Sequence, residues 1–180
     1  MNLITERLIL KEISYNDLDM IHRLHSIPEV DEYNTIGIPK SLEETRKIIQ
    51  RDIEDQNKSL RSRFCWIIFL RESDEFVGLA GMSLSNDRFK LAEFYYKFFP
   101  IFWGNGYATE TAKHIIRFGF EDLKLHRIEA GVATENKVSI RVLEKVGMTN
   151  EGIRRKILPI RGEWKDNFHF AILENEFHEQ

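Results

Sequence analysis

Two glycines in the middle of the chain stand where a run of apolar and aromatic residues gives way to a helical pattern. The turn runs from Trp103 to Thr109, with glycines at positions 104 and 106. Glycine lets the backbone approach a bound group closely, and the first amides of a helix have no partners within the helix. Because a helix N-terminus also carries about half a positive charge, this turn could cradle a pyrophosphate. The same residues could equally form a tight turn that serves only backbone geometry.

Two familiar phosphate-binding patterns fit this turn poorly. A Walker loop requires Gly-Lys followed by Ser or Thr, and the sequence contains no such run. A dinucleotide-binding fingerprint requires Gly or Ala three positions after the second glycine, where this chain has Thr109. The turn therefore calls for a different class of phosphate ligand, if it binds one.

Hydrophobic periodicity on either side of the turn predicts the elements that must hold it. Alternating apolar residues indicate strands, and short polar turns at 72–75 and 86–88 favour an antiparallel meander. The predicted strands are Leu8–Ile13, Arg63–Arg71, Phe76–Ser83, Leu91–Phe99, Ile128–Val132, Gly152–Ile157 and Phe168–Leu173. The predicted helices are Tyr15–His25, one that begins at Ser41, one that begins inside the glycine turn, and Asn136–Gly147.

Residues that start and stop helices support these boundaries. Ser41 is a favoured N-cap, and Glu44 completes a capping box. Asn105 is placed to cap the helix that begins in the glycine turn, and Asn136 to cap the next helix, which Gly147 ends. The order of elements predicts an α/β (α+β) fold, a single mixed and mostly antiparallel sheet of about seven strands flanked by about four helices.

Composition limits the size and partners of the protein. The 180 residues, 42% of them hydrophobic, fit one domain that spans 1–180. A formal charge of −3 provides no general cationic field, so we expect neither a nucleic-acid nor a membrane partner. The chain lacks a signal-peptide pattern and an apolar run of about 18 residues, and we expect a cytoplasmic location. Cys65, the only cysteine, is expected to be buried and structural, and the histidine spacing predicts no metal site.

Several motifs in order along the chain resemble the GNAT superfamily of N-acetyltransferases. The resemblance is strongest to the RimJ/RimL-like branch of ribosomal-protein N-terminal acetyltransferases and covers nearly the whole chain. The motifs are Thr5–Leu10, Ala92–Tyr96, Phe102–Glu110, Leu125–Ala130, Asn136–Ser139, Leu143–Met148 and Glu151–Arg154. The superfamily usually has Gln or Arg where this chain has Trp103, and an aromatic residue there is common in this branch.

The resemblance implies acetyl-coenzyme A as the co-substrate. The backbone of Phe98 and Phe99 would pair with its pantetheine arm as an added strand, while amides of the glycine turn hold the pyrophosphate. Asn136 would bond the pantetheine arm, although helix capping alone would also explain it. The implied cofactor-binding residues are Phe98, Phe99, Trp103, Gly104, Asn105, Gly106, Tyr107, Ala108, Thr109, Asn136 and Ser139.

Acetylation of an amine requires a base, a group that stabilises the developing oxyanion and a proton for the leaving thiolate. The predicted catalytic groups are the Glu93 carboxylate as base, the Tyr96 backbone N–H as oxyanion donor and the Ser139 hydroxyl near the sulfur. Many superfamily members place a tyrosine seven residues after Asn136, but this chain has Leu143 there. Glu93 could also be a solvated charge or a substrate anchor, and Ser139 could simply bond its own helix.

The identity of the base and of the amine stays open at this stage. The branch suggests a second carboxylate after Glu151 and Gly152, but residues 155–158 contain none, and Asp166 is the other acid that the resemblance places near the site. The basic residues at 154–156 and Arg161 fit solvated surface charges. We expect an N-acetyltransferase that acts on a primary amine, either a peptide α-amine or a small molecule, and a possible homodimer. The alternative is a non-catalytic acyl-coenzyme A-binding module of the same fold.

Overall fold

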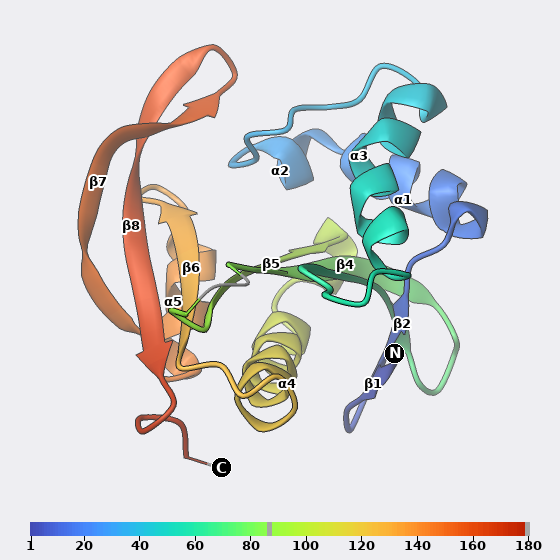
Figure 1. Cartoon of the computed structure of the whole chain (residues 1–180). Helices are drawn as coiled ribbons and strands as arrows, with labels where there is room; N and C mark the ends of the chain where they lie inside the picture. Colours follow the sequence, from blue (N-terminus) through green and yellow to red (C-terminus); the bar gives the residue numbers. More distant parts are fainter. Residues whose placement is uncertain (86–87, 179–180) are drawn as a thin grey trace.

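The computed structural model describes residues 1–85 and 88–178, and in this part of the chain a single sheet of eight strands crosses the molecule (Figure 1). The strands are β1 (Leu3–Ile4), β2 (Leu8–Glu12), β3 (Arg63–Leu70), β4 (Phe76–Leu84), β5 (Leu91–Phe98), β6 (Arg127–Ala133), β7 (Thr149–Ile160) and β8 (Glu163–Leu173). The helices are α1 (Leu18–His25), α2 (Pro28–Asp31), α3 (Leu42–Asp55), α4 (Tyr107–Glu121) and α5 (Lys137–Lys145), with 3₁₀ turns η1 (Tyr15–Asp17) and η2 (Pro100–Phe102).

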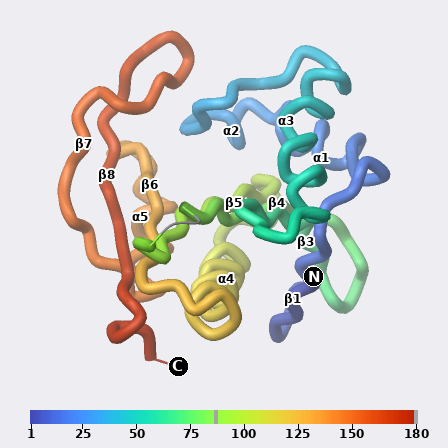
Figure 2. The backbone as a smooth tube through the Cα atoms, in the orientation of Figure 1, coloured from blue at the N-terminus to red at the C-terminus, as the bar shows by residue number. Residues whose placement is uncertain are grey.

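The strands lie in the order β1-β2-β3-β4-β5-β6-β8-β7, and every neighbouring pair is antiparallel except β5 and β6. A parallel pair requires a crossover connection, and α4 provides it. Helices α4 and α5 pack on one face of the sheet, and α1 and α3 pack on the other (Figure 2). The parallel junction of β5 and β6 thus lies between two helical layers.

Side chains of β5 alternate between the two layers. Phe94 and Phe98 belong to the larger core beneath α4 and α5, whereas Tyr95 and Phe99 pack in the core beneath α1 and α3. Because successive strand residues point to opposite faces, Glu93 and Lys97 share the face of Tyr95. This alternation decides on which side of the sheet each candidate side chain lies.

The predicted mixed α/β sheet is confirmed, with small differences in the counts. Strand β1 and helix α2 were not expected, so the described residues hold eight strands and five α-helices rather than about seven and about four. The antiparallel meander of β3, β4 and β5 is as predicted. The predicted helix Tyr15–His25 begins as η1 and becomes α-helical only at Leu18. Of the predicted polar turn at 86–88, Asn86 and Asp87 lie outside the described residues.

Two of the predicted helix caps are confirmed. Ser41 accepts from the N–H of Glu44 at 3.3 Å, and Asn136 accepts from the N–H of Ser139 at 3.1 Å. The reciprocal half of the capping box is displaced by one residue, since the Glu44 carboxylate accepts from the N–H of Lys40 rather than from Ser41. Gly147 ends α5 in the left-handed conformation, as predicted, with φ of 84°.

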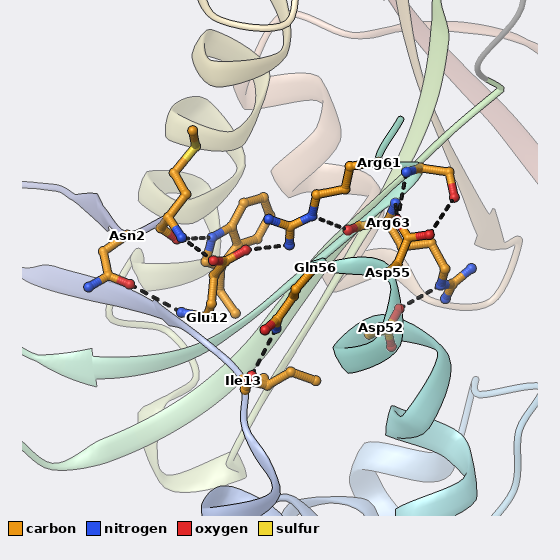
Figure 3. A network of polar contacts seen from close by, with 11 residues as sticks. Asn2, Glu12, Ile13, Asp52, Asp55, Gln56, Arg61 and Arg63 are labelled. Atoms are coloured by element: carbon orange, nitrogen blue, oxygen red, sulfur yellow. Dashed lines mark hydrogen bonds and ion pairs between the residues drawn. The ribbon is translucent and has the colours of Figure 1, made fainter. Parts of the chain in front are cut away.

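A network of charged residues fixes the end of α3 to the sheet (Figure 3). The buried Asp55 carboxylate accepts hydrogen bonds at 2.6 Å from the backbone N–H groups of Ser62 and Arg63. Burial by itself raises the pKa of Asp55, but hydrogen bonds from Lys58, Ser62 and Arg63 outweigh it and lower the pKa to about 2. Asp52 pairs with the Arg63 guanidinium at 2.6 Å on the same helix face. These contacts hold α3 against β3.

Two further observations bear on the sequence-based expectations. Cys65 is 1% exposed, as predicted, and burial raises the pKa of its thiol to about 12. None of the described helices combines the length and the apolar composition needed to cross a membrane.

Candidate active site

The glycine turn enters α4 through two left-handed residues. Gly104 has φ of 81° and Gly106 has φ of 82°, a conformation that side chains disfavour. The predicted Asn105 cap is wrong, because Gly106 occupies the N-cap position. The Asn105 side chain instead donates to the carbonyl of Phe102 at 3.1 Å and so bonds the turn itself. The two glycines leave the start of α4 without a capping side chain.

The first amides of α4 are therefore available to a ligand. The helical ladder begins with the N–H of Glu110, which donates to the carbonyl of Gly106 at 3.0 Å. The N–H groups of Tyr107, Ala108 and Thr109 precede it and have no acceptor four residues back in the helix. Together with the helix dipole, these amides favour a phosphate at this end of α4.

Contacts from the N-terminus of the chain hold the turn in place. The Arg7 side chain donates to the Glu110 carboxylate at 2.7 Å and to the carbonyl of Asn105 at 3.0 Å. Glu110 also accepts from the Thr5 hydroxyl at 2.5 Å and from the Arg7 N–H at 2.8 Å. Burial raises the pKa of Glu110, and these hydrogen bonds lower it by more. The motif that begins at Thr5 thus fixes the start of α4, which sequence reasoning did not assign to it.

Strands β5 and β6 pair over only a short stretch. Their parallel register covers Leu91–Glu93 and Arg127–Glu129 and then ends, although β5 continues to Phe98 and β6 to Ala133. Beyond Glu93 the edge of β5 has no paired strand on the β6 side. We call this unpaired stretch of β5, residues 94–98, the slot edge.

Backbone direction along β5 shows which groups the slot edge presents. The N–H of Phe99 donates to Val77 of β4 at 3.1 Å, whereas the carbonyl of Lys90 accepts from His126, beside β6, at 2.8 Å. Since backbone groups alternate along a strand, odd-numbered residues of β5 face β4 and even-numbered residues face β6. Past Glu93, the even-numbered residues therefore direct their N–H and C=O groups into the unpaired edge.

Two predicted cofactor contacts and the predicted oxyanion donor can be placed on this edge. The N–H groups of Tyr96 and Phe98 both point toward it. The carbonyl of Phe98 already accepts from the Trp103 indole N–H at 2.8 Å, which ties the glycine turn to the end of β5. The N–H of Phe99 serves β4, and its carbonyl accepts from Phe102 at 2.9 Å. Phe98 is therefore better placed than Phe99 to pair with an added strand.

On the α4–α5 side of the sheet, the Tyr96 hydroxyl and Ser139 come together. Burial raises the pKa of Tyr96 to about 12, and the nearby Ser139 side chain acts against that rise. Tyr96 Oη is buried and has no hydrogen-bond partner among the described residues. Ser139 stands in the first turn of α5, where its backbone N–H is bonded by Asn136. The Ser139 hydroxyl is thus left for a different task.

Glu93 lies on the opposite face, beneath α1 and α3, where it is exposed. It is level with Glu129 of β6 in the parallel register. Glu129 accepts from Arg127 at 2.7 Å and lies 3.2 Å from the Nε2 atom of His169, which also contacts Arg154 at 3.2 Å. The second acid expected near the site, Asp166, accepts from the N–H of Lys156 at 2.9 Å within the β7–β8 hairpin.

Sequence reasoning missed the polar residues that β8 contributes to this face. His169 and Asn167 are buried, and neither His169 Nδ1 nor Asn167 Oδ1 has a hydrogen-bond partner within 1–85 and 88–178. Asn167 leans over Gly131, where a Cβ would lie 3.0 Å from its amide nitrogen. Arg154 and Arg161 are exposed, as expected of solvated charges, and they also contact His169 and Asp31, respectively. The described residues contain no group of three or more side chains that could hold a metal ion.

Comparison with known proteins identifies the family. The family model for the acetyltransferase (GNAT) domain matches residues 7–149, and the chain belongs to this family. An uncharacterized N-acetyltransferase, p20, from Bacillus licheniformis is 32% identical over 97% of both chains. A GNAT-family acetyltransferase from Bacillus anthracis is 31% identical, with a TM-score of 0.84 over 98% of this chain and 100% of that one. RimJ from Mycobacterium smegmatis, solved with CoA-disulfide, shares the fold at 22% identity, with a TM-score of 0.86 over 96% and 85%.

Membership of this family defines the class of enzyme. The chain is an acetyl-CoA-dependent N-acetyltransferase. The unpaired edge beside an amide-rich helix start fits a co-substrate that has both an amide-bearing arm and a pyrophosphate.

Proposed function

We propose that the chain transfers the acetyl group of acetyl-CoA to a primary amine by direct attack in a ternary complex. The slot edge of β5 carries this proposal, because it lies unpaired next to the free amides of α4. It also has candidate proton-transfer groups on both faces of the sheet, with Glu93 on one face and Ser139 on the other. An amine could thus approach from the α1–α3 side while the thiolate departs toward α5.

On the cofactor side, backbone groups do most of the binding. The N–H of Phe98 would pair with the pantetheine arm in the manner of an added strand. The amides from Gly104 to Thr109 would hold the pyrophosphate, with Trp103 fixing the turn to β5. Asn136 uses its side-chain oxygen to cap α5, which leaves its amide nitrogen to donate to the arm.

In the chemical step, each charge that develops has a group placed to receive it. The Tyr96 N–H points into the slot, where it can stabilise the oxyanion that forms on the acetyl carbonyl. Glu93 accepts the proton of the attacking amine, directly or through water. Ser139, in contact with the Tyr96 hydroxyl, supplies or relays the proton that the thiolate takes up.

The branch of the family, the cellular location and the partners are proposals as well. We propose a place in the RimJ/RimL-like branch, supported by the shared fold of RimJ and by the motifs at 102–110 and 136–139. We also propose a cytoplasmic enzyme whose partners are acetyl-CoA and an amine, without nucleic acid or membrane, and which forms a homodimer. The acceptor is either a peptide α-amine or a small molecule.

Release of free thiol from acetyl-CoA tests the proposed function. Purified protein would be assayed with a panel of peptides, amino acids, polyamines and other primary amines over a range of pH. We expect amine-dependent thiol release, with formation of the N-acetylated product by mass spectrometry. Tight coenzyme A binding without amine-dependent release would reject catalysis and favour the non-catalytic module.

A further inference from the structure

Buried polar atoms without partners gather on the α1–α3 face beside the slot edge. His25, at the end of α1, is 3% exposed, and Asp31, at the end of α2, is 4% exposed. Within residues 1–85 and 88–178, neither ring nitrogen of His25 nor Oδ1 of Asp31 has a hydrogen-bond partner. Native proteins leave few buried polar atoms unpaired, and those that remain often belong to binding sites. We call His25, Asp31, Lys97 and Arg161 the polar cluster.

Lys97 brings a cation to this cluster from the slot edge itself. It follows Tyr96 in the chain and shares the face of Tyr95 and Phe99, so its side chain lies on the α1–α3 side. No hydrogen bond or ion pair to Lys97 Nζ is found in the described part of the chain. Burial lowers the pKa of Lys97 to about 8, and the nearby Asp31 carboxylate acts against this shift.

Arg161 adds a second cation from the β7–β8 hairpin. Its Nε atom lies 3.5 Å from Asp31 Oδ2, and its Nη2 donates to the carbonyl of Pro28 at 2.8 Å. The hairpin and α2 therefore meet over this part of the sheet, as their facing positions in Figure 1 also show. Burial and the nearby Lys97 lower the pKa of His25 to about 3, so this ring is neutral. Two cations and one carboxylate leave the cluster with an excess positive charge.

The other end of the same face, around Glu93, carries acidic groups instead of basic ones. Glu93 and Glu129 lie level with each other where the strands part, and Glu93 is exposed there. These groups suit the N–H donors of an amine. Glu93 and Lys97 are four residues apart on one strand, which separates their Cα atoms by about 13 Å. The acidic and the basic groups therefore lie at opposite ends of the unpaired stretch of β5.

We propose that the acceptor is a primary amine that also bears a carboxylate, with its amine directed toward Glu93 and its carboxylate bound by Lys97 and Arg161. A carboxylate at this position would give the Lys97 ammonium the hydrogen-bonded counter-charge that the chain does not supply. The carboxylate could belong to a free α-amino acid or to an acidic side chain next to a peptide N-terminus. The inference rests on the proposed function, because it names the substrate class of the same site.

Matched pairs of acceptors that differ only in the carboxylate test this inference. The amino-acid arm compares L-alanine with L-alaninamide, and the peptide arm compares Ala-Asp-amide with Ala-Asn-amide. The measured quantity is the ratio of kcat/KM for the acid to that for the amide. We expect Lys97→Met to lower this ratio about tenfold in the arm that contains the natural acceptor class, and Arg161→Gln to lower it about threefold. Since each pair is compared across variants, intrinsic differences in amine reactivity cancel.

Two variants act as controls. Lys47→Met removes an exposed lysine of α3 and should leave the ratio unchanged, and Lys97→Arg, which keeps the charge, should retain most of the preference. A ratio that Lys97→Met leaves unchanged in both arms would overturn the inference. If no amine is acetylated at all, the proposed function fails. The anion site is then tested by calorimetric binding of the same pairs in the presence of coenzyme A, where equal affinities for acid and amide would reject it.

Discussion

Glu93 is the residue whose assigned role can be tested most directly. Glu93→Gln keeps the size of the side chain but removes the proton acceptor, so we expect kcat to fall about 100-fold or more. Coenzyme A affinity should change by less than about twofold, because Glu93 lies on the face of the sheet away from α4 and α5. Steady-state kinetics and coenzyme A titration measure the two quantities. Glu121→Gln, at the exposed end of α4, is the matched control.

An unchanged kcat in Glu93→Gln would remove Glu93 from the chemistry. The next candidates on that face would then be His169 and Glu129, which lie 3.2 Å apart. A positioned carboxylate beside a histidine is a common arrangement for proton transfer. If His169→Gln lowers kcat while Glu93→Gln leaves both kcat and KM unchanged, the role of general base belongs to the pair of His169 and Glu129.

Ser139 is expected to act on turnover rather than on folding. Ser139→Ala removes the hydroxyl that faces Tyr96 but keeps the backbone N–H bonded by Asn136, so α5 should begin as before. We expect kcat to fall about 10- to 100-fold, with the melting temperature and coenzyme A affinity nearly unchanged. Tyr96→Phe, which removes the neighbouring hydroxyl, should also lower kcat. Full turnover by Ser139→Ala would leave the serine only its backbone role.

The elements that carry the predicted cofactor contacts could be recognised from sequence, whereas most polar residues on the acceptor side could not. The cofactor contacts themselves stay predictions. The predicted cofactor contacts belong to two short segments, Gly104–Thr109 and Asn136–Ser139. Within such a segment, the sequence spacing alone indicates how the residues lie relative to one another. His169 meets Glu129 only through the pairing of β8 with β6, and Arg161 meets Asp31 only through a hairpin contact 130 residues along the chain. Gly106 supplanted Asn105 as the cap because a left-handed backbone there outweighs the preference for a capping side chain.

At the scale of elements, length decided which predictions succeeded. Helices α3 and α4 contain enough turns to show helical periodicity, and both were predicted. Strand β1 has two residues and helix α2 has four, too few for any period to emerge. Strand β7 is longer than the predicted Gly152–Ile157. The prediction was too short because nearly all side chains of β7 are exposed, and an exposed strand shows no apolar alternation.

The junction of α3 with the sheet should make stability depend on acid pH. Asp55 has a folded pKa of about 2, below the usual value of 3.8 for an aspartate, so its carboxylate stabilises the fold above about pH 4. That contribution should be lost as the pH falls from about 4 toward 2. Asp55→Ala should cost about 2–4 kcal/mol of unfolding free energy at pH 7, because two buried N–H groups lose their acceptor.

Urea unfolding at a series of pH values measures both effects. In Asp55→Ala, the curve of stability against pH should be flatter below pH 4 than in the parent protein. Glu54→Gln, one residue earlier on the exposed side of the same helix, should leave the curve unchanged. If the unfolding free energy of Asp55→Ala falls below pH 4 as steeply as that of the parent protein, other carboxylates dominate the loss of stability in acid.

At the scale of the whole molecule, the candidate site lies where the sheet changes from antiparallel to parallel pairing. Strands β1 to β5 form one side and β6, β8 and β7 the other, and in the described part of the chain the register of Leu91–Glu93 with Arg127–Glu129 joins them. The α4 crossover forces this junction to be parallel, and the same helix supplies the free amides. A ligand that fills the unpaired edge therefore adds contacts across this seam between the two parts of the sheet.

Binding at this seam should raise the stability of the entire chain. Coenzyme A at about 100 times its Kd stabilises a folded protein by about 2.7 kcal/mol when it binds only the native state. For a domain of this size, that corresponds to a rise in melting temperature of about 5–11 °C. Gly106→Val should abolish the rise, because a β-branched residue resists φ of 82° and its side chain crowds Arg7 and the amides of the turn.

Gly37→Val provides the matched control for the strain itself. Gly37 also has positive φ, of 79°, with open space around its Cβ position, but it lies in the loop between α2 and α3. Both variants should melt at a lower temperature than the parent without ligand. Only Gly37→Val should recover the full rise on addition of coenzyme A. An equal rise in both variants would refute the placement of the pyrophosphate at the start of α4, because the substitution that blocks those amides would then have no effect on binding.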